Sequence, residues 1–259
     1  MKRLQTALLF VLLFLLSTAI EAQQAGDIRG AYALVKQSIN MGNGDSVLQN
    51  EQVKLFTDKY VIYAHKRQDT LASFGVGRYN FSNERIVENV FFNEEGAQKN
   101  TYELVISKND EGYRQVINMK ATDGKDFILT EDYKNLAKFI SSPLDGAWKL
   151  VKVKRIATDG KTSVDKNRTQ FKLYESGNFI WAVHFKDAPA GQRGSGFGYG
   201  TFEMTNDAKA METNTKSSYS SIVDMPVTLH IKFVGKNKFE QSIDWPNGMK
   251  EKETYQRLK

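Results

Sequence analysis

The chain contains two copies of one sequence pattern, and this duplication constrains the fold more than any other feature. Gly30 to Val35 reads Gly-Ala-Tyr-Ala-Leu-Val, and Gly146 to Val151 reads Gly-Ala-Trp-Lys-Leu-Val. Further matches follow in the same order, ending with Glu131 to Leu136 against Glu253 to Leu258. A period of about 115 residues is far longer than the roughly 20 to 50 residues of stacked repeats, so each copy is expected to fold as a domain of its own.

Each copy consists of short runs of β-branched and aromatic residues that are separated by turn residues. Close spacing of this kind predicts antiparallel strands rather than βαβ units. In one run of the second copy, bulky side chains take every second place, which puts Phe179, Trp181 and Val183 on one face of a strand. The alignment of the two copies places Tyr63 and His65 on the corresponding face in the first copy.

A glycine-rich strand favours a closed barrel over a β-sandwich, which is the other solution for many short antiparallel strands. Glycine occupies every second position from Gly194 to Gly200, and the first copy keeps Gly75 and Gly77. Such a row marks sharp coiling of the strand or a close approach by other groups. The sequence therefore predicts an all-β protein of two tandem, small, antiparallel up-and-down β-barrels, each of about 115 residues.

Residues 1–22 have the character of a signal peptide. Lys2 and Arg3 precede the apolar stretch from Ala7 to Leu16, and Ala22 ends a tail that can be cleaved. The apolar stretch is shorter than the roughly 20 residues of a membrane span. We therefore expect a periplasmic or secreted protein with no stable membrane span after cleavage.

The leader and the duplication divide the chain into four segments. We expect a signal peptide over 1–22, a first barrel over 23–140, a linker at 141–144 and a second barrel over 145–259. The linker is short, so the two barrels are expected to touch. The chain contains no cysteine, so packing must stabilise it without disulfides.

Three short motifs resemble the lipocalin-like domains of exported Bacteroidetes proteins: an opening Gly-x-Trp strand, a glycine-rich strand that leads to a Glu, and a final Glu-x-Tyr-x-Arg-Leu. The resemblance implies small calycin-type barrels that bind a small apolar or amphipathic ligand without a cofactor. In the broader lipocalin pattern, a first-strand Trp packs under a last-strand Arg and closes the barrel floor. Trp148 and Arg257 stand at those positions in the second copy. The first copy has Tyr32 and Asn135 instead, so its floor is expected to be looser or closed differently.

Glu88 and Glu212 are the best polar candidates for ligand contacts, because they lie at nearly the same distance past the glycine strand in both copies. A carboxylate that points inward would be partly desolvated and could bind a ligand hydroxyl or amine. The alternatives are an outward Glu, or an inward one paired with a structural Arg or Tyr. The other candidates form the expected inner face: Tyr63, His65, Phe179, Trp181 and Val183. These side chains either fill the interior or line a ligand cavity.

Motifs for catalysis, metals or cofactors are not found. The sequence has no His-Glu-x-x-His, zinc signature, Gly-x-Ser-x-Gly, phosphate loop or calcium loop. An acid–base pair of Glu88 or Glu212 with His65 would need a hydrogen-bonded partner that the sequence does not place. We therefore expect no catalytic residues, no metal and no cofactor.

The charge balance argues against nucleic acid as a partner. Lysine and arginine number 36 against 30 acidic residues, a net charge of +6, but no basic run concentrates this excess. The predicted function is an exported, non-catalytic binding protein that holds a small hydrophobic or amphipathic ligand in one or both barrels. The alternative is a cell-envelope module with filled barrels whose surface contacts a protein or glycan. Exposed Tyr199 and Tyr219 on loops would favour this alternative.

Overall fold

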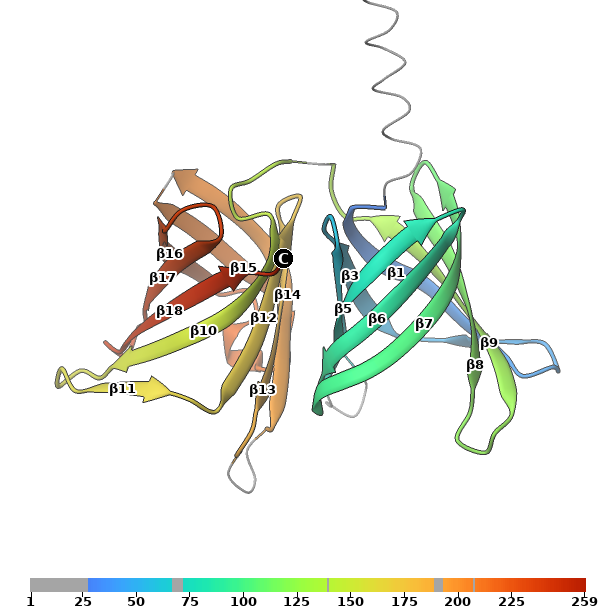
Figure 1. Cartoon of the computed structure of the whole chain (residues 1–259), viewed down its shortest axis with the longest axis horizontal. Helices are drawn as coiled ribbons and strands as arrows, with labels where there is room; N and C mark the ends of the chain where they lie inside the picture. The colour runs from blue at the N-terminus through green and yellow to red at the C-terminus, as the bar shows by residue number, and fades with distance from the viewer. Residues whose placement is uncertain (1–27, 67–71, 139, 189–192, 207) are drawn as a thin grey trace, which may run out of the picture.

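Two closed β-barrels lie side by side in the computed structural model, which describes residues 28–66, 72–138, 140–188, 193–206 and 208–259 (Figure 1). The expected signal peptide at 1–22 lies outside these residues. No helix within the described ranges has the length and apolar character to cross a membrane.

The first barrel is a ring of eight antiparallel strands with one additional short strand. Neighbours along the chain pair with each other, and β9 pairs back with β1 to close the ring. The short strand β2 lies outside the ring and extends the ladder of β1. The strands are β1 (Gly30–Asn40), β2 (Asp45–Leu48), β3 (Glu51–Phe56), β4 (Tyr60–Lys66), β5 (Ala72–Ser82), β6 (Arg85–Asn93), β7 (Gly96–Asn109), β8 (Gly112–Lys120) and β9 (Asp126–Asn135).

The second barrel repeats this topology strand by strand, with β18 pairing back with β10 and β11 outside the ring. The all-β fold of two tandem up-and-down barrels is therefore confirmed. The elements are β10 (Gly146–Ile156), β11 (Thr162–Asp165), β12 (Arg168–Glu175), β13 (Asn178–Phe185), β14 (Ser195–Asn206), β15 (Lys209–Ser217), a short 3-10 helix η1 (Ser220–Ile222), β16 (Pro226–Phe233), β17 (Lys238–Asp244) and β18 (Lys250–Arg257).

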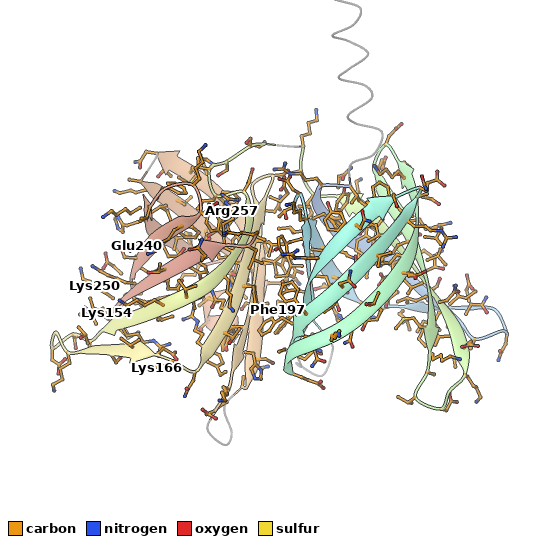
Figure 2. All side chains as sticks on the ribbon, in the orientation of Figure 1. Lys154, Lys166, Phe197, Glu240, Lys250 and Arg257 are labelled. Carbon is orange, nitrogen blue, oxygen red and sulfur yellow. The ribbon has the colours of Figure 1, made fainter. Side chains whose placement is uncertain are left out.

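The barrels contact each other through the outer faces of β3, β4 and β5 on one side and β12, β13 and β14 on the other. The Phe171 ring lies 5.4 Å from the Phe91 ring and 4.8 Å from the Phe92 ring, centroid to centroid. Phe197 belongs to the same apolar cluster, on the side of the second barrel that faces the first (Figure 2). Tyr199 is also buried there, with 8% of its surface exposed, so it is not the exposed aromatic that would favour the envelope module.

Side chains of a barrel strand usually point inward if they are apolar and outward if they are polar. Along β12 this order is reversed where the two barrels touch. The apolar side chains of Phe171 and Leu173 point outward into the contact between the barrels. The alternation of a strand then turns the intervening Gln170 and Lys172 inward, where both are buried. The interface between the barrels therefore places polar side chains inside the second barrel.

A partly buried ion pair joins the two barrels. Arg29, just before β1, places its Nε 2.9 Å from Oε2 of Glu175 at the end of β12, and the Glu175 side chain is fully buried. Burial raises the pKa of Glu175 to about 7 from an ordinary value of 4.5, although Arg29 opposes the shift. The folded protein therefore binds a proton at Glu175 more tightly than the unfolded chain does.

This pKa predicts a stability that falls as the pH rises. The contribution of Glu175 to the free energy of unfolding is fully present below pH 4.5 and is lost as the pH rises through about 7. We expect this group to lower the free energy of unfolding by about 1–3 kcal/mol between about pH 5 and about pH 7.5. Urea unfolding of the wild type and of Glu175→Gln at both pH values measures the effect, because the variant cannot titrate there. Equal pH dependence in the two proteins would contradict it.

Candidate functional site

The interior of the second barrel contains a cavity of about 230 Å³. Side chains therefore do not fill this barrel completely. Its main apolar lining consists of Trp181, Val183, Phe185, Tyr219, Leu229 and Trp245. Its main polar lining consists of Arg168, Gln170, Lys172, Glu212, Gln241 and Glu253.

The glycine row of β14 faces this cavity and makes room for Trp181. Gly198 pairs with Trp181 across the strands, and a Cβ atom on Gly198 would lie 2.6 Å from the indole ring. The Trp181 ring stacks on Tyr219 at 6.1 Å between centroids, and its Nε1 donates a hydrogen bond of 3.1 Å to Asn214 Oδ1. The close approach that the glycine row predicts is present. Tyr219 lines the cavity and is only partly exposed, so it gives little support to the envelope module.

Glu212 points inward and is paired. Its carboxylate lies 2.7 Å from Lys172 Nζ and accepts a hydrogen bond of 2.5 Å from Tyr174 Oη. Both charged side chains are almost completely buried, at 3% exposure for Lys172 and 6% for Glu212. Of the alternatives that the sequence leaves open, the structure has the inward carboxylate paired with a Tyr, and Lys172 adds an ion pair that the sequence does not predict.

A second polar cluster lies around Glu253 on β18. The Glu253 carboxylate forms an ion pair with Arg168 and accepts hydrogen bonds from Gln241 Nε2 at 2.6 Å and Tyr255 Oη at 2.9 Å. Burial raises the pKa of Glu253. Burial also works to raise the pKa of Glu251, but Arg168 and the hydrogen bonds with Glu253 and Arg155 together hold this pKa below its ordinary value. The charges of the cavity lining are therefore already paired with one another.

Two polar atoms of residues that line the cavity have no hydrogen-bond partner within the described portion of the chain. Gln241 Oε1 and Trp245 Nε1 are buried and have no hydrogen-bond partner among the described residues. One is an acceptor and the other is a donor. A buried polar atom without a partner costs about 1–3 kcal/mol, so both atoms favour a ligand that supplies the missing bonds.

The first barrel repeats the buried ion pair. Lys54 Nζ lies 2.6 Å from Glu88 Oε1, and both side chains are 3% exposed. Tyr63 occupies the position of Trp181 and lies against Gly75, in the same way that Trp181 lies against Gly198. Burial raises the pKa of Tyr63 well above its ordinary value. His65 follows on β4 and is half-buried.

The floors of the two barrels are closed differently. The Arg257 guanidinium lies 4.0 Å from the centre of the Trp148 ring, and Trp148 Nε1 donates a 2.7 Å hydrogen bond to the Leu144 carbonyl. The predicted contact between Trp148 and Arg257 is therefore present. In the first barrel, Tyr32 likewise packs edge-on, against Tyr113 at 4.8 Å, and donates a 3.0 Å hydrogen bond to the Ile28 carbonyl, but Asn135 is paired with it where the second barrel has Arg257.

The structure brings Trp181, Val183 and Glu212 together at the cavity. Phe179 lies deeper, fully buried in the apolar cluster around Trp148. Sequence reasoning missed the polar lining from β12, although the pattern Gln-x-Lys-x-aromatic occurs in both copies, at Gln52 and again at Gln170. In the part of the chain that the structure describes, no group of three or more His, Cys, Asp or Glu side chains is placed to hold a metal.

Comparison with known proteins adds similarities of fold. No protein-family model matches the chain, and no curated protein matches its sequence. A lipocalin-like protein from Bacteroides uniformis is similar at 14% identity over 45% of this chain and 100% of its own, with a TM-score of 0.32. An uncharacterized protein from Saccharomyces cerevisiae is similar at 10% identity over 88% of this chain and 98% of its own, with a TM-score of 0.49. Similarities this distant assign no function.

Proposed function

We propose that the protein is a non-catalytic binding protein that holds a small amphipathic molecule in the second barrel. The observation that carries this proposal is the cavity of about 230 Å³, in which aromatic and aliphatic side chains surround a few polar groups. Small-molecule sites are commonly apolar hollows with a small number of placed polar groups. The volume lies below their usual range of about 300–1,000 Å³, so the ligand is small or extends out of the barrel.

The polar groups of the cavity favour an uncharged head on the ligand. Lys172 and Glu212 neutralise each other, and Arg168 is paired with both Glu251 and Glu253, of which Glu251 is also paired with Arg155. Gln241 Oε1 and Trp245 Nε1 are the atoms without partners. A hydroxyl group suits either atom, because it can donate a hydrogen bond to the Gln241 oxygen or accept one from the Trp245 N–H. The apolar lining then contributes affinity at roughly 25 cal/mol per Å² of apolar surface that leaves water.

The proposal assigns the ligand to the second barrel and assigns no ligand contact to Tyr63, His65 or Glu88 of the first. It also places the protein outside the cytoplasm. Support for this location comes from the basic and apolar character of residues 1–22.

Replacing Trp181 with alanine tests the proposal. The indole forms much of the apolar lining, so we expect Trp181→Ala to weaken the binding of 1-decanol, a neutral amphipathic probe, about tenfold. Isothermal titration calorimetry measures the affinity directly. Tyr63→Ala is the matched control, because it removes the ring at the aligned position of the first barrel and should leave the affinity unchanged.

Two results would contradict this function. The first is the absence of decanol binding to the wild type, together with no ligand in a denaturing extract of protein purified from its own cells. The second is an equal loss of affinity in Trp181→Ala and Tyr63→Ala, because binding would then not depend on the second barrel in particular.

A further inference from the structure

The outer wall of the second barrel has a basic face on the side away from the first barrel, where Lys154, Glu240 and Lys250 lie (Figure 2). Strands β10, β15, β16, β17 and β18 form this face around a shallow hollow of about 510 Å³. Directly paired residues cross it in two rows. The first row is Lys209, His230, Ser242, Lys252 and Lys154. The second row is Lys232, Glu240, Thr254 and Lys152.

The basic face brings together lysines that are far apart in the sequence. The residues that line the hollow include five lysines and two glutamates, a net charge of +3 with His230 neutral, and one of these glutamates, Glu253, is buried and also lines the interior cavity. Neighbouring strands lie about 4.8 Å apart, so these charges are close together across the sheet. No ion pair is present for these five lysines among the described residues.

Lys154 stands directly opposite Lys252. Like charges in directly opposite positions destabilise a sheet. This arrangement therefore works against the stability of the barrel, and an anionic partner would relieve the repulsion.

The first barrel provides an internal comparison. At the aligned positions, Ser38 stands opposite Thr130, where the second barrel has Lys154 opposite Lys252. Asp132 stands at the position of Thr254 and forms an ion pair with Arg114 at 2.6 Å. The fold therefore does not require the lysines, and the basic face is a property of the second copy alone.

We propose that this face binds an acidic polysaccharide. Its positive rows match a chain that repeats carboxylate or sulfate groups, and the hydroxyls of Ser242 and Thr254 between the lysines can hydrogen-bond to sugars. An anionic membrane fits less well, because binding at a lipid surface usually combines charge with buried apolar area. No large apolar side chain is exposed among the residues that line the hollow.

The test replaces Lys154 and Lys252 with the residue types that the first barrel has at the aligned positions. We expect the full chain to bind heparin in low salt, and the variant Lys154→Ser/Lys252→Thr to bind it about tenfold more weakly, because it loses two charge contacts. Lys99→Glu/Lys125→Glu, on the first barrel, should leave the affinity within about twofold despite its larger change in net charge. Polygalacturonate should compete with heparin, whereas neutral dextran should not.

Three results would overturn the proposal. They are unchanged heparin affinity in Lys154→Ser/Lys252→Thr, an equal loss in the first-barrel variant, and binding to phosphatidylglycerol vesicles without binding to either polysaccharide. The Ser/Thr pair is already accommodated at the aligned positions of the first barrel, and equal urea unfolding of the variant and the wild type excludes a folding defect. Decanol binding should be the same in all these proteins, so this test is independent of the cavity ligand.

Discussion

Lys172→Met is expected to lower the free energy of unfolding by about 3–5 kcal/mol, because it leaves the Glu212 carboxylate buried without its cation. Lys172 and Glu212 are 3% and 6% exposed, so water does not replace the lost partner. Tyr174 still donates its hydrogen bond, but a neutral hydroxyl does not balance the charge. Urea unfolding at neutral pH measures the loss.

The double variant Lys172→Met/Glu212→Gln separates the ion pair from simple packing. It removes both charges and keeps an acceptor for the Tyr174 hydroxyl. Replacing both members of a buried pair is often close to neutral, so most of the lost stability should return. If the double variant is as unstable as Lys172→Met, the uncompensated charge is not the cause of the loss.

Trp148→Ala is expected to lower the free energy of unfolding by about 3–5 kcal/mol, the usual cost of removing a large buried aromatic ring. Trp148 is fully buried and packs edge-on against Phe239 at 4.7 Å, with Arg257 over its face. The substitution opens the floor of the second barrel and also removes the hydrogen bond to the Leu144 carbonyl.

Arg257→Met is the matched control for the floor. It keeps most of the packing against Trp148 but removes the cation–π contact, so a smaller loss of about 0.5–2 kcal/mol is expected. Urea unfolding of both variants gives the comparison. Equal losses would mean that the guanidinium rather than the indole closes the floor, and a loss below about 1 kcal/mol for Trp148→Ala would remove its structural role.

The barrel architecture follows from sequence because it depends on local patterns. The alternation of bulky side chains predicts the inner face of β13, and the alignment of the two copies predicts the corresponding face of β4. The Trp148–Arg257 contact is what the resemblance to lipocalin-like domains implies, and the pairing of Trp148 with Arg257 in the ladder agrees with it.

The polar lining and the contact between the barrels do not follow from the same patterns. Phe171, Leu173 and Phe197 are buried against the other barrel, so β12 and β14 are covered on both faces. A strand covered on both faces has no solvent side, and alternation then cannot tell which side chains point inward. For this reason the sequence predicts neither the inward direction of Lys172 nor the burial of Tyr199 between the barrels.

The contact between the barrels joins aligned strands: β3 meets β12, β4 meets β13 and β5 meets β14. In a symmetric homodimer, too, the same strands of both subunits form the interface. In a homodimer every substitution appears in both subunits, whereas fusion into one polypeptide lets each half change alone. Tethering also makes the association intramolecular, with an effective concentration on the order of millimolar for a short linker. One half is thereby free to serve as a scaffold while the other acquires new surface chemistry, as Lys154 and Lys252 against Ser38 and Thr130 illustrate.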